Sequence, residues 1–447
     1  MKNELGTEVM EMEEMSPAQE YNEQGQSLYG LGKDEEAMKM YKKALDEDPA
    51  CTETYLNMAK LYITKGSLTE ARDSLNRLLR IDKNSGEAYF HLGNISYLEG
   101  KAEEAVADYT TAADSDTFDG RPALYHLALL YIDMGKPKQA LFHLNRLLKL
   151  DPFHAEGRLR KIELLVTMGR FEEALKNAEK MTELLPDLFE GYHYQFITLL
   201  GMERMGEALA VLEHAGELFP KDLGFVYDKI KYFEQTEEYD RAIGLIDDRF
   251  RDSLEDYRAI RKEKAKILCA AGRFEEAGTL LREILDEEYD TEMCYLMMHL
   301  YEMDGLYEKE MECCRRIQEN GGEGQYYFAA LFFEAAALDK LGRTDEALAK
   351  YRENIPKFRQ ATGKYRGNFI LWLYRILCYR RVGEYDRALE LSDYLITLTD
   401  RQMGEAFFVK GMLYGDLCDK VKEKEFKDRG LMLSPVLNGA IGAVMTG

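Results

Sequence analysis

The chain has 447 residues, of which 46% are hydrophobic and 32% are charged, and 82 acidic against 59 basic side chains give a net charge of −23. The apolar fraction is enough for a packed core and excludes a wholly disordered chain. The acidic excess disfavours nucleic acid as the main partner, because phosphate binding depends on Lys and Arg. At about 150 residues per domain, the length alone would suggest about three domains.

The first fifteen residues form an acidic segment with five glutamates and no apolar run. We therefore expect residues 1–15 to be a flexible tail and not a signal peptide. The longest apolar stretch of the whole chain runs from Tyr326 to Leu338. It is well short of the roughly 20 residues that a membrane-spanning helix needs, so we expect no membrane span.

From residue 16 to residue 433, the sequence repeats a pattern of residue types about every 34 positions. The early segments share an aromatic residue at the fourth place, a small residue at the eighth, a glycine at the fifteenth and an alanine at the twentieth. This order and spacing resemble the tetratricopeptide repeat (TPR). The segments begin at Ala18, Thr52, Gly86, Arg121, Ala155, Phe189, Leu223, Arg258, Thr291, Phe328, Phe369 and Gly404.

The residue types at these places have a physical explanation. Each repeat is expected to form two helices that are too short to be stable alone in water. Small residues at the eighth and twentieth places let the two helices lie close together, and glycine at the fifteenth allows the turn between them. Because no repeat buries its apolar face unaided, about twelve must stack. The resemblance implies an all-α fold, a TPR-like right-handed superhelical solenoid of antiparallel helix pairs over residues 16–433.

Some segments depart from the pattern. The twentieth-place alanine is replaced by Glu310 in the ninth segment and by Glu423 in the last. Residues 320–325 contain three glycines, and we predict a joint of the solenoid there. The interval before Phe369 is the longest, and residues 357–367 are expected to form an elongated connection.

Residues 434–447 carry no charged side chain and several apolar ones. Two interpretations of this C-terminal tail remain open. The tail either covers the exposed end of the solenoid or acts as a docking peptide for a partner or for a neighbouring copy of the chain.

Seven cysteines without regular spacing indicate neither a disulfide framework nor a zinc module. The adjacent Cys313 and Cys314 are interpreted as two buried thiols, not as a redox pair. Reduced thiols are typical of the cytoplasm, and we expect a cytoplasmic protein. His91 and His126 occupy equivalent places in neighbouring repeats, but no third ligand accompanies them, and no metal site is predicted.

The sequence contains no phosphate-binding loop, dinucleotide-binding motif or hydrolase signature. We therefore predict no enzymatic activity and no cofactor. Some helical repeats of similar length read RNA. Their binding surface should be basic, whereas this chain is acidic, so we expect no nucleic-acid partner.

In the TPR family, ligands usually lie in a concave groove formed by the first helix of each repeat, at its second, fifth, sixth, ninth and twelfth places. Aromatic rings there offer apolar area at low entropic cost, and amides can both donate and accept hydrogen bonds. Alternatively, several of these rings pack between neighbouring first helices. The resemblance gives a groove of Asn57, Lys60, Phe90, His91, Asn94, Tyr125, His126, Arg160, His193, Tyr194 and Tyr227. The corresponding places further along hold Tyr295, Phe332, Phe333, Tyr374 and Phe408.

The stretch from Arg352 to Arg387 has nine basic and three acidic residues, in contrast to the rest of the chain. It is either a solvated face or a docking patch for an acidic segment. The candidate patch residues are Lys357, Arg359, Lys364, Arg366, Arg380 and Arg381.

These observations favour a non-enzymatic scaffold or adaptor that holds a peptide or partner segment in its groove. The first alternative is a regulatory or sensor subunit whose curvature changes when a peptide binds. The second is an α-helical hydrolase with carboxylates in the concave face, which the alanine and glycine pattern disfavours. The carboxylate clamp of chaperone-binding TPR proteins is missing from the matching places. The partner's identity and the oligomeric state are not predicted by the sequence.

Overall fold

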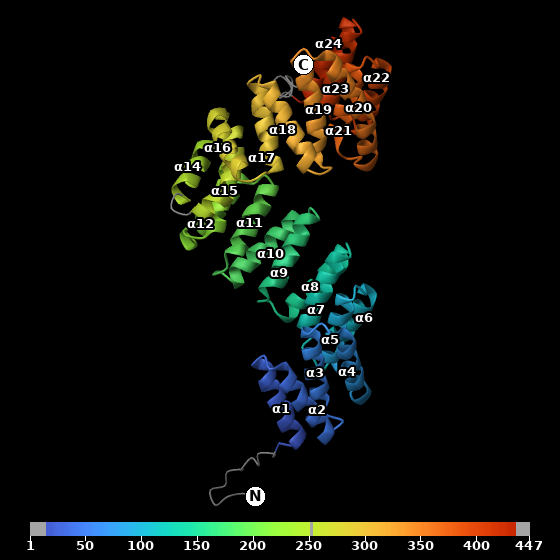
Figure 1. Ribbon diagram of the computed structural model, residues 1–447. Helices are drawn as coiled ribbons and strands as arrows, with labels where there is room; N and C mark the ends of the chain where they lie inside the picture. The colour runs from blue at the N-terminus through green and yellow to red at the C-terminus, as the bar shows by residue number, and fades with distance from the viewer. Residues whose placement is uncertain (1–14, 251–253, 435–447) are drawn as a thin grey trace, which may run out of the picture. The chain divides into compact units, whose positions relative to one another are not determined.

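The computed structural model describes residues 15–250 and 254–434. These residues form 24 α-helices and no β-strand, and consecutive helices are arranged as antiparallel pairs (Figure 1). The all-α repeat fold expected from the sequence is confirmed. Residues 1–14 of the predicted N-terminal tail and residues 435–447 of the predicted C-terminal tail lie outside the described residues.

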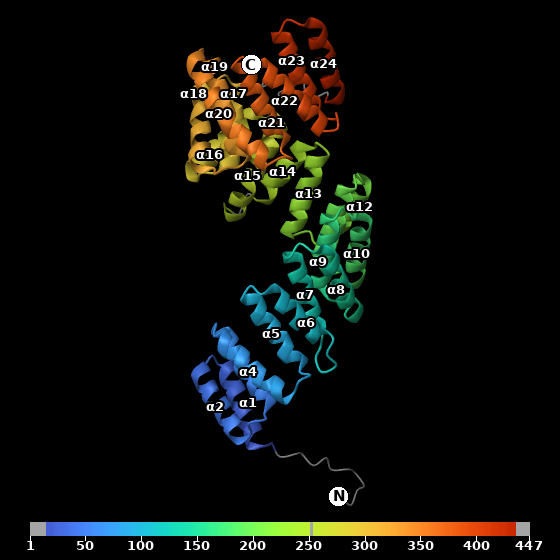
Figure 2. The same ribbon diagram turned by 90° about the vertical axis from the view of Figure 1, so that its right-hand side faces the viewer.

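By the packing of its helices, the chain divides into an N-terminal unit, residues 1–229, and a C-terminal unit, residues 230–447. In the N-terminal unit, consecutive helices lie side by side in chain order (Figure 2). Its helices are α1 (Pro17–Gly30), α2 (Asp34–Glu47), α3 (Thr52–Thr64), α4 (Leu68–Ile81), α5 (Gly86–Leu98), α6 (Ala102–Ala113), α7 (Arg121–Asp133), α8 (Pro137–Leu150), α9 (Ala155–Thr167), α10 (Phe171–Leu184), α11 (Phe189–Gly201) and α12 (Met205–Leu218).

The boundary between the units falls within α13 (Leu223–Gln235). The predicted joint at residues 320–325 lies inside the C-terminal unit, between its helices α18 and α19, and stays a prediction. The C-terminal unit continues with α14 (Tyr239–Arg249), α15 (Leu254–Ala270), α16 (Phe274–Glu287), α17 (Thr291–Met303), α18 (Tyr307–Asn320), α19 (Gln325–Lys340), α20 (Thr344–Lys364), α21 (Phe369–Arg381), α22 (Tyr385–Leu398), α23 (Gly404–Asp416) and α24 (Lys420–Leu433).

The turn inside each repeat uses the left-handed backbone conformation that favours glycine. Gly32, Gly66 and Gly100 have φ angles of 73°, 74° and 74°. Where the glycine is replaced, the turn keeps its shape, because Glu203 and Glu237 have φ angles of 58° and 59°. The packing of the two helices therefore fixes the turn even against the preference of the side chain.

The expected elongated connection at residues 357–367 is wrong for most of its length, because α20 continues to Lys364. Pro356 lies inside this helix and is exposed. Phe358 is fully buried and packs against the rings of Phe328 and Tyr374, with ring centroids 6.1 and 5.9 Å apart. Burial of Phe358 holds the helix together beyond the proline, against the usual helix-breaking effect.

No helix within the described ranges is long and apolar enough to cross a membrane. Cys313 and Cys314 are buried, as their interpretation as packed thiols requires, and all seven cysteines are free thiols. The cytoplasmic location inferred from this cysteine usage stays a prediction.

The small residues of each repeat allow close contact between its two helices. The twentieth-place alanines Ala37, Ala71 and Ala105 have no exposed surface. Gly93, at the eighth place of the third repeat, lies directly against the ring of Tyr109, which is 1% exposed. A Cβ atom on Gly93 would lie 2.6 Å from Tyr109 Cδ1.

Replacing Gly93 with alanine is expected to lower the unfolding free energy of the N-terminal unit by about 1–2 kcal/mol, because the Tyr109 ring must move. Urea unfolding followed by hydrogen exchange in α5 and α6 measures the change. Gly206→Ala is the matched control, since its Cβ atom would meet no atom within 4 Å. Equal stability of the Gly93→Ala chain and the wild type would contradict the close packing.

Candidate peptide-binding surface

We call the predicted groove residues from Asn57 to Tyr227 the binding row. The row begins with paired polar side chains on α3 and α5. Asn57 Nδ2 donates a hydrogen bond to Asn22 Oδ1 at 3.1 Å. Lys60 Nζ lies 2.8 Å from Glu87 Oε1, and His91 Nε2 lies 3.9 Å from the same oxygen. Burial, with a smaller effect of Lys60, lowers the pKa of His91 to about 4, so this imidazole is neutral at pH 7.

The middle of the row is largely taken up by packing between repeats. The ring of Phe90 lies 5.3 Å from that of His126 and 5.9 Å from that of Tyr109, measured between centroids. Asn94 Oδ1 accepts a hydrogen bond from the Tyr109 hydroxyl at 2.7 Å. Burial lowers the pKa of His126. Phe90, Asn94 and His126 therefore have contacts within the unit that a ligand would have to share.

The first helices of the next three repeats are joined by a hydrogen-bonded network. Arg160 Nη1 on α9 lies 2.9 Å from Glu163 Oε2. The Tyr194 hydroxyl on α11 donates to Glu163 Oε1 at 2.6 Å. Hydrogen bonds to Glu163 and then to Tyr125 on α7 raise the pKa of Arg160. The Arg160 side chain is 49% exposed, so the network faces solvent.

The row ends on α11 and α13 of the N-terminal unit. His193 Nδ1 lies 2.9 Å from both carboxylate oxygens of Asp228, a residue that is only 4% exposed. Tyr227 is 40% exposed. Lys60, Arg160 and His193 thus each have a carboxylate partner, and the row as a whole carries little net charge.

The C-terminal unit contains a hollow of about 880 Å³ that we call the aromatic hollow. Tyr295, Phe333 and Tyr374 lie in its wall, on α17, α19 and α21. They occupy fifth or sixth places of their repeats, the places that the resemblance assigns to ligand contact. Its other lining residues are His299, Gln325, Gly367, Asn368, Phe369, Ile370, Leu373, Leu377, Met403 and Glu405.

Aromatic contacts build the wall of the hollow. The ring of His299 lies edge-on to those of Tyr295 and Phe333, at centroid distances of 4.5 and 4.9 Å. Phe332 stacks on Tyr374 at 4.9 Å, but Phe332 itself is only 4% exposed. Phe408 is also buried, at 8% exposure. Phe333, although it lines the hollow, is only 2% exposed. Phe332, Phe333 and Phe408 therefore belong mainly to the packing of the unit, whereas Tyr295 and Tyr374 are half-buried and face the hollow.

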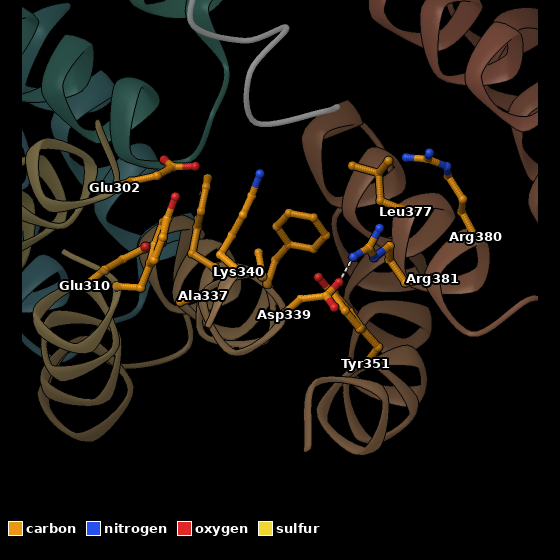
Figure 3. Close-up of a pocket in the computed structure, with 13 residues that line it drawn as sticks. Glu302, Glu310, Ala337, Asp339, Lys340, Tyr351, Leu377, Arg380 and Arg381 are labelled. Carbon is orange, nitrogen blue, oxygen red and sulfur yellow. Dashed lines mark ion pairs between the residues drawn. The ribbon is translucent and has the colours of Figure 1, made fainter. Parts of the chain in front are cut away.

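A second, smaller pocket of about 30 Å³ lies beside Glu310 (Figure 3). Glu310 is 1% exposed, and its Oε2 atom has no hydrogen-bond partner. Burial, reinforced by the charge of Glu302 and opposed by that of Lys340, raises the pKa of Glu310 to about 8. On the other side of the pocket, Arg381 forms an ion pair with Asp339. Glu310 stands at the twentieth place of its repeat, where most repeats have a buried alanine. This replacement was the feature of the sequence that pointed to Glu310.

The six residues of the predicted basic patch have different surroundings. Arg380 pairs with Asp416 at 2.6 Å, and Arg381 pairs with Asp339. Lys357 pairs with Glu353 on its own helix at 2.7 Å. The other three are exposed: Arg359, which donates to the Tyr379 hydroxyl at 3.0 Å, Lys364, whose Nζ lies 5.0 Å from the Tyr365 ring centroid, and Arg366. Docking of an acidic segment on this patch stays a prediction.

Four family models match the chain. Three are described as tetratricopeptide repeat and match residues 28–93, 86–118 and 122–154. The fourth, described as tetratrico peptide repeat, matches residues 328–429. These matches cover segments in both units.

Curated relatives are similar over limited segments. The chain is 28% identical over 141 residues to BBSome complex member BBS4 of Bos taurus, a match that covers 32% of this chain and 27% of BBS4. It is 33% identical over 87 residues to protein O-mannosyl-transferase Tmtc3 of Drosophila melanogaster, which covers 20% of this chain and 9% of Tmtc3. The matched segments thus span less than a third of either relative.

Among solved structures, the chain is similar to YrrB, described as a TPR protein with an unusual peptide-binding site. The identity is 24%, the TM-score is 0.35, and the match covers 42% of this chain and 97% of that chain.

Proposed function

We propose, because the chain belongs to the tetratricopeptide repeat family, that it is a non-enzymatic scaffold that binds a segment of a partner protein. The partner segment would lie along the first helices of the N-terminal unit. The network of Tyr125, Arg160, Glu163 and Tyr194 carries this proposal, since it aligns rings and hydrogen-bonding groups on three consecutive first helices. Such side chains supply contact area and polar contacts at low entropic cost.

The charges of the row favour a particular kind of partner. Arg160 and His193 already have carboxylate partners, Glu163 and Asp228. An acidic peptide would have to displace these carboxylates, whereas a peptide backbone can hydrogen-bond to the exposed polar edges. We therefore propose a weakly charged, extended segment that is held by backbone hydrogen bonds and by contact with Tyr125 and Tyr194.

Of the two curated relatives, BBS4 supports the scaffold proposal and Tmtc3 does not bear on it. BBS4 is named as a member of a complex, and a role in a multi-protein assembly supports the scaffold proposal. Tmtc3 is named as a transferase, but the match covers 9% of it. We propose no transferase activity for this chain.

A peptide library selected on the full-length chain tests the proposal. Binding of the selected peptides is expected to weaken about tenfold in the Arg160→Ala variant, because the network loses its exposed hydrogen-bond donor. Arg170→Ala is the matched control. Arg170 is 42% exposed, against 49% for Arg160, and it also pairs with a glutamate three residues on, Glu173. It is the N-cap residue of α10, the second helix of its repeat, and so lies outside the first-helix face.

Two results would contradict the proposal. The first is that no peptide is enriched on the wild-type chain. The second is that Arg160→Ala and Arg170→Ala weaken peptide binding to the same extent, because the first-helix face would then have no special role.

A further inference from the structure

The aromatic hollow of the C-terminal unit has the chemistry of a site for an uncharged apolar segment. Among its thirteen lining residues, Glu405 is the only acidic one and none is Lys or Arg, although 32% of the chain is charged. Ile370, in its wall, is 55% exposed. An exposed aliphatic side chain among aromatic rings in a concave surface is typical of a surface that another segment covers.

The chain itself contains a segment of matching chemistry. Residues 435–447 comprise thirteen residues without a single charged side chain, and they include Val436, Leu437, Ile441 and Val444. Placing such a segment in the hollow would remove apolar surface from water without burying a charge. An acidic or basic segment would lose hydration there and would find only Glu405 as a charged partner.

The residue that precedes this segment, Ser434, lies at the edge of the hollow. Ser434, the last described residue, donates a hydrogen bond from Oγ to Glu405 Oε1 at 3.0 Å, and Glu405 lines the hollow. Thirteen extended residues reach roughly 43 Å. The hollow is lined by four first helices, α17, α19, α21 and α23. Three helix spacings of about 9 Å amount to roughly 27 Å, which the segment can cross.

We propose that residues 435–447 bind in the aromatic hollow as an intramolecular ligand of the C-terminal unit. Because the segment is tethered at Ser434, its effective concentration at the hollow is on the order of millimolar. An external apolar peptide has to displace it before it can use the hollow. This inference does not depend on the proposed role of the N-terminal unit.

Photo-crosslinking in the full-length chain tests the proposal. The probe is p-benzoylphenylalanine in place of Val444, and the crosslinked peptides are identified by mass spectrometry. We expect crosslinks within one chain to residues of α19 and α21 that line the hollow. The crosslink yield is expected to fall roughly tenfold in the Ile370→Asp variant, because a carboxylate then faces the uncharged segment.

Met432→Asp is the control, since it adds the same charge two residues before Ser434 on a side chain that is 83% exposed. Ile441→Asp repeats the test from the side of the segment, without any change to the helices, and should lower the yield as well. Crosslinks to α24 would instead place the segment on the end of the unit, and crosslinked dimers would identify a second copy as the occupant. Either result, the absence of crosslinks, or an unchanged yield in both the Ile370→Asp and Ile441→Asp variants would overturn the proposal.

Discussion

Replacing Glu310 with alanine is expected to raise the unfolding free energy of the C-terminal unit by roughly 4 kcal/mol at pH 8. Glu310 is 1% exposed and one of its oxygens has no partner. The pKa of this carboxyl is raised to about 8, first by burial and then by Glu302. An ionised Glu310 would therefore be both desolvated and repelled. Alanine is the residue that most repeats have at this place.

The sign of the pH dependence follows from the two pKa values. The carboxyl releases its proton near pH 4.5 in the unfolded chain but only near pH 8 in the folded chain. Between these values the folded state binds more protons, so the contribution of Glu310 to stability falls as pH rises from about 4.5 to about 8. Each pKa unit corresponds to about 1.4 kcal/mol. Both Glu310→Ala and Glu310→Gln should remove this fall.

The fluorescence of Trp372 reports on this unit directly. It is the single tryptophan of the chain, and it is buried in α21. Urea unfolding at pH 6 and pH 8 should show a smaller loss of stability with pH for Glu310→Ala than for the wild type. Glu308→Ala, on an exposed site of the same helix, is the control and should leave the pH dependence unchanged. An identical pH dependence of Glu310→Ala and the wild type would mean that Glu310 does not titrate in this range.

The repeat fold could be predicted because its signals are local and recur at a fixed interval. The small residues at two places and the glycine turn recur in most segments, so the loss of one signal does not hide the others. The first helices α3, α5 and α7 begin at Thr52, Gly86 and Arg121, where the sequence pattern places its segments. The one clear error in the fold, at residues 357–367, arose because a buried Phe358 keeps a helix intact beyond Pro356.

The surface could be predicted only as a set of places, because exposure depends on other elements. Phe90 and His126 are covered by Tyr109, which comes from the second helix of a repeat. The first-helix pattern alone contains no information on this contact. In the C-terminal unit, by contrast, Tyr295 and Tyr374 at corresponding places face a hollow. Whether a ring packs or faces solvent is decided by the size of its neighbours in the adjacent helices.

The hydrogen bonds of Glu334 connect three helices around the predicted joint at residues 320–325. Glu334 lies on α19 and is 4% exposed. Its Oε2 atom accepts hydrogen bonds from Gln318 on α18 at 3.0 Å and from Lys350 on α20 at 3.1 Å. Its Oε1 atom lies 3.5 Å from Arg315 Nε, also on α18. Both carboxylate oxygens of Glu334 therefore have hydrogen-bond donors, whereas Glu310 Oε2 has none.

Glu334→Ala is therefore expected to lower the unfolding free energy of the C-terminal unit by about 3 kcal/mol, since it removes a buried acceptor shared by the half-buried Gln318 and Lys350 and by the exposed Arg315. Hydrogen exchange should increase most in α18 and α19, the helices on either side of residues 320–325. Glu353→Ala is the control, because its ion pair with Lys357 lies within one helix at an exposed site and should contribute little. If Glu334→Ala changes stability no more than Glu353→Ala, the hydrogen bonds of Glu334 do not hold the two sides of the predicted joint together, and packing alone does. If exchange rises in α18 and α19 while Trp372 unfolds as in the wild type, the two sides separate locally, as a joint at this position requires.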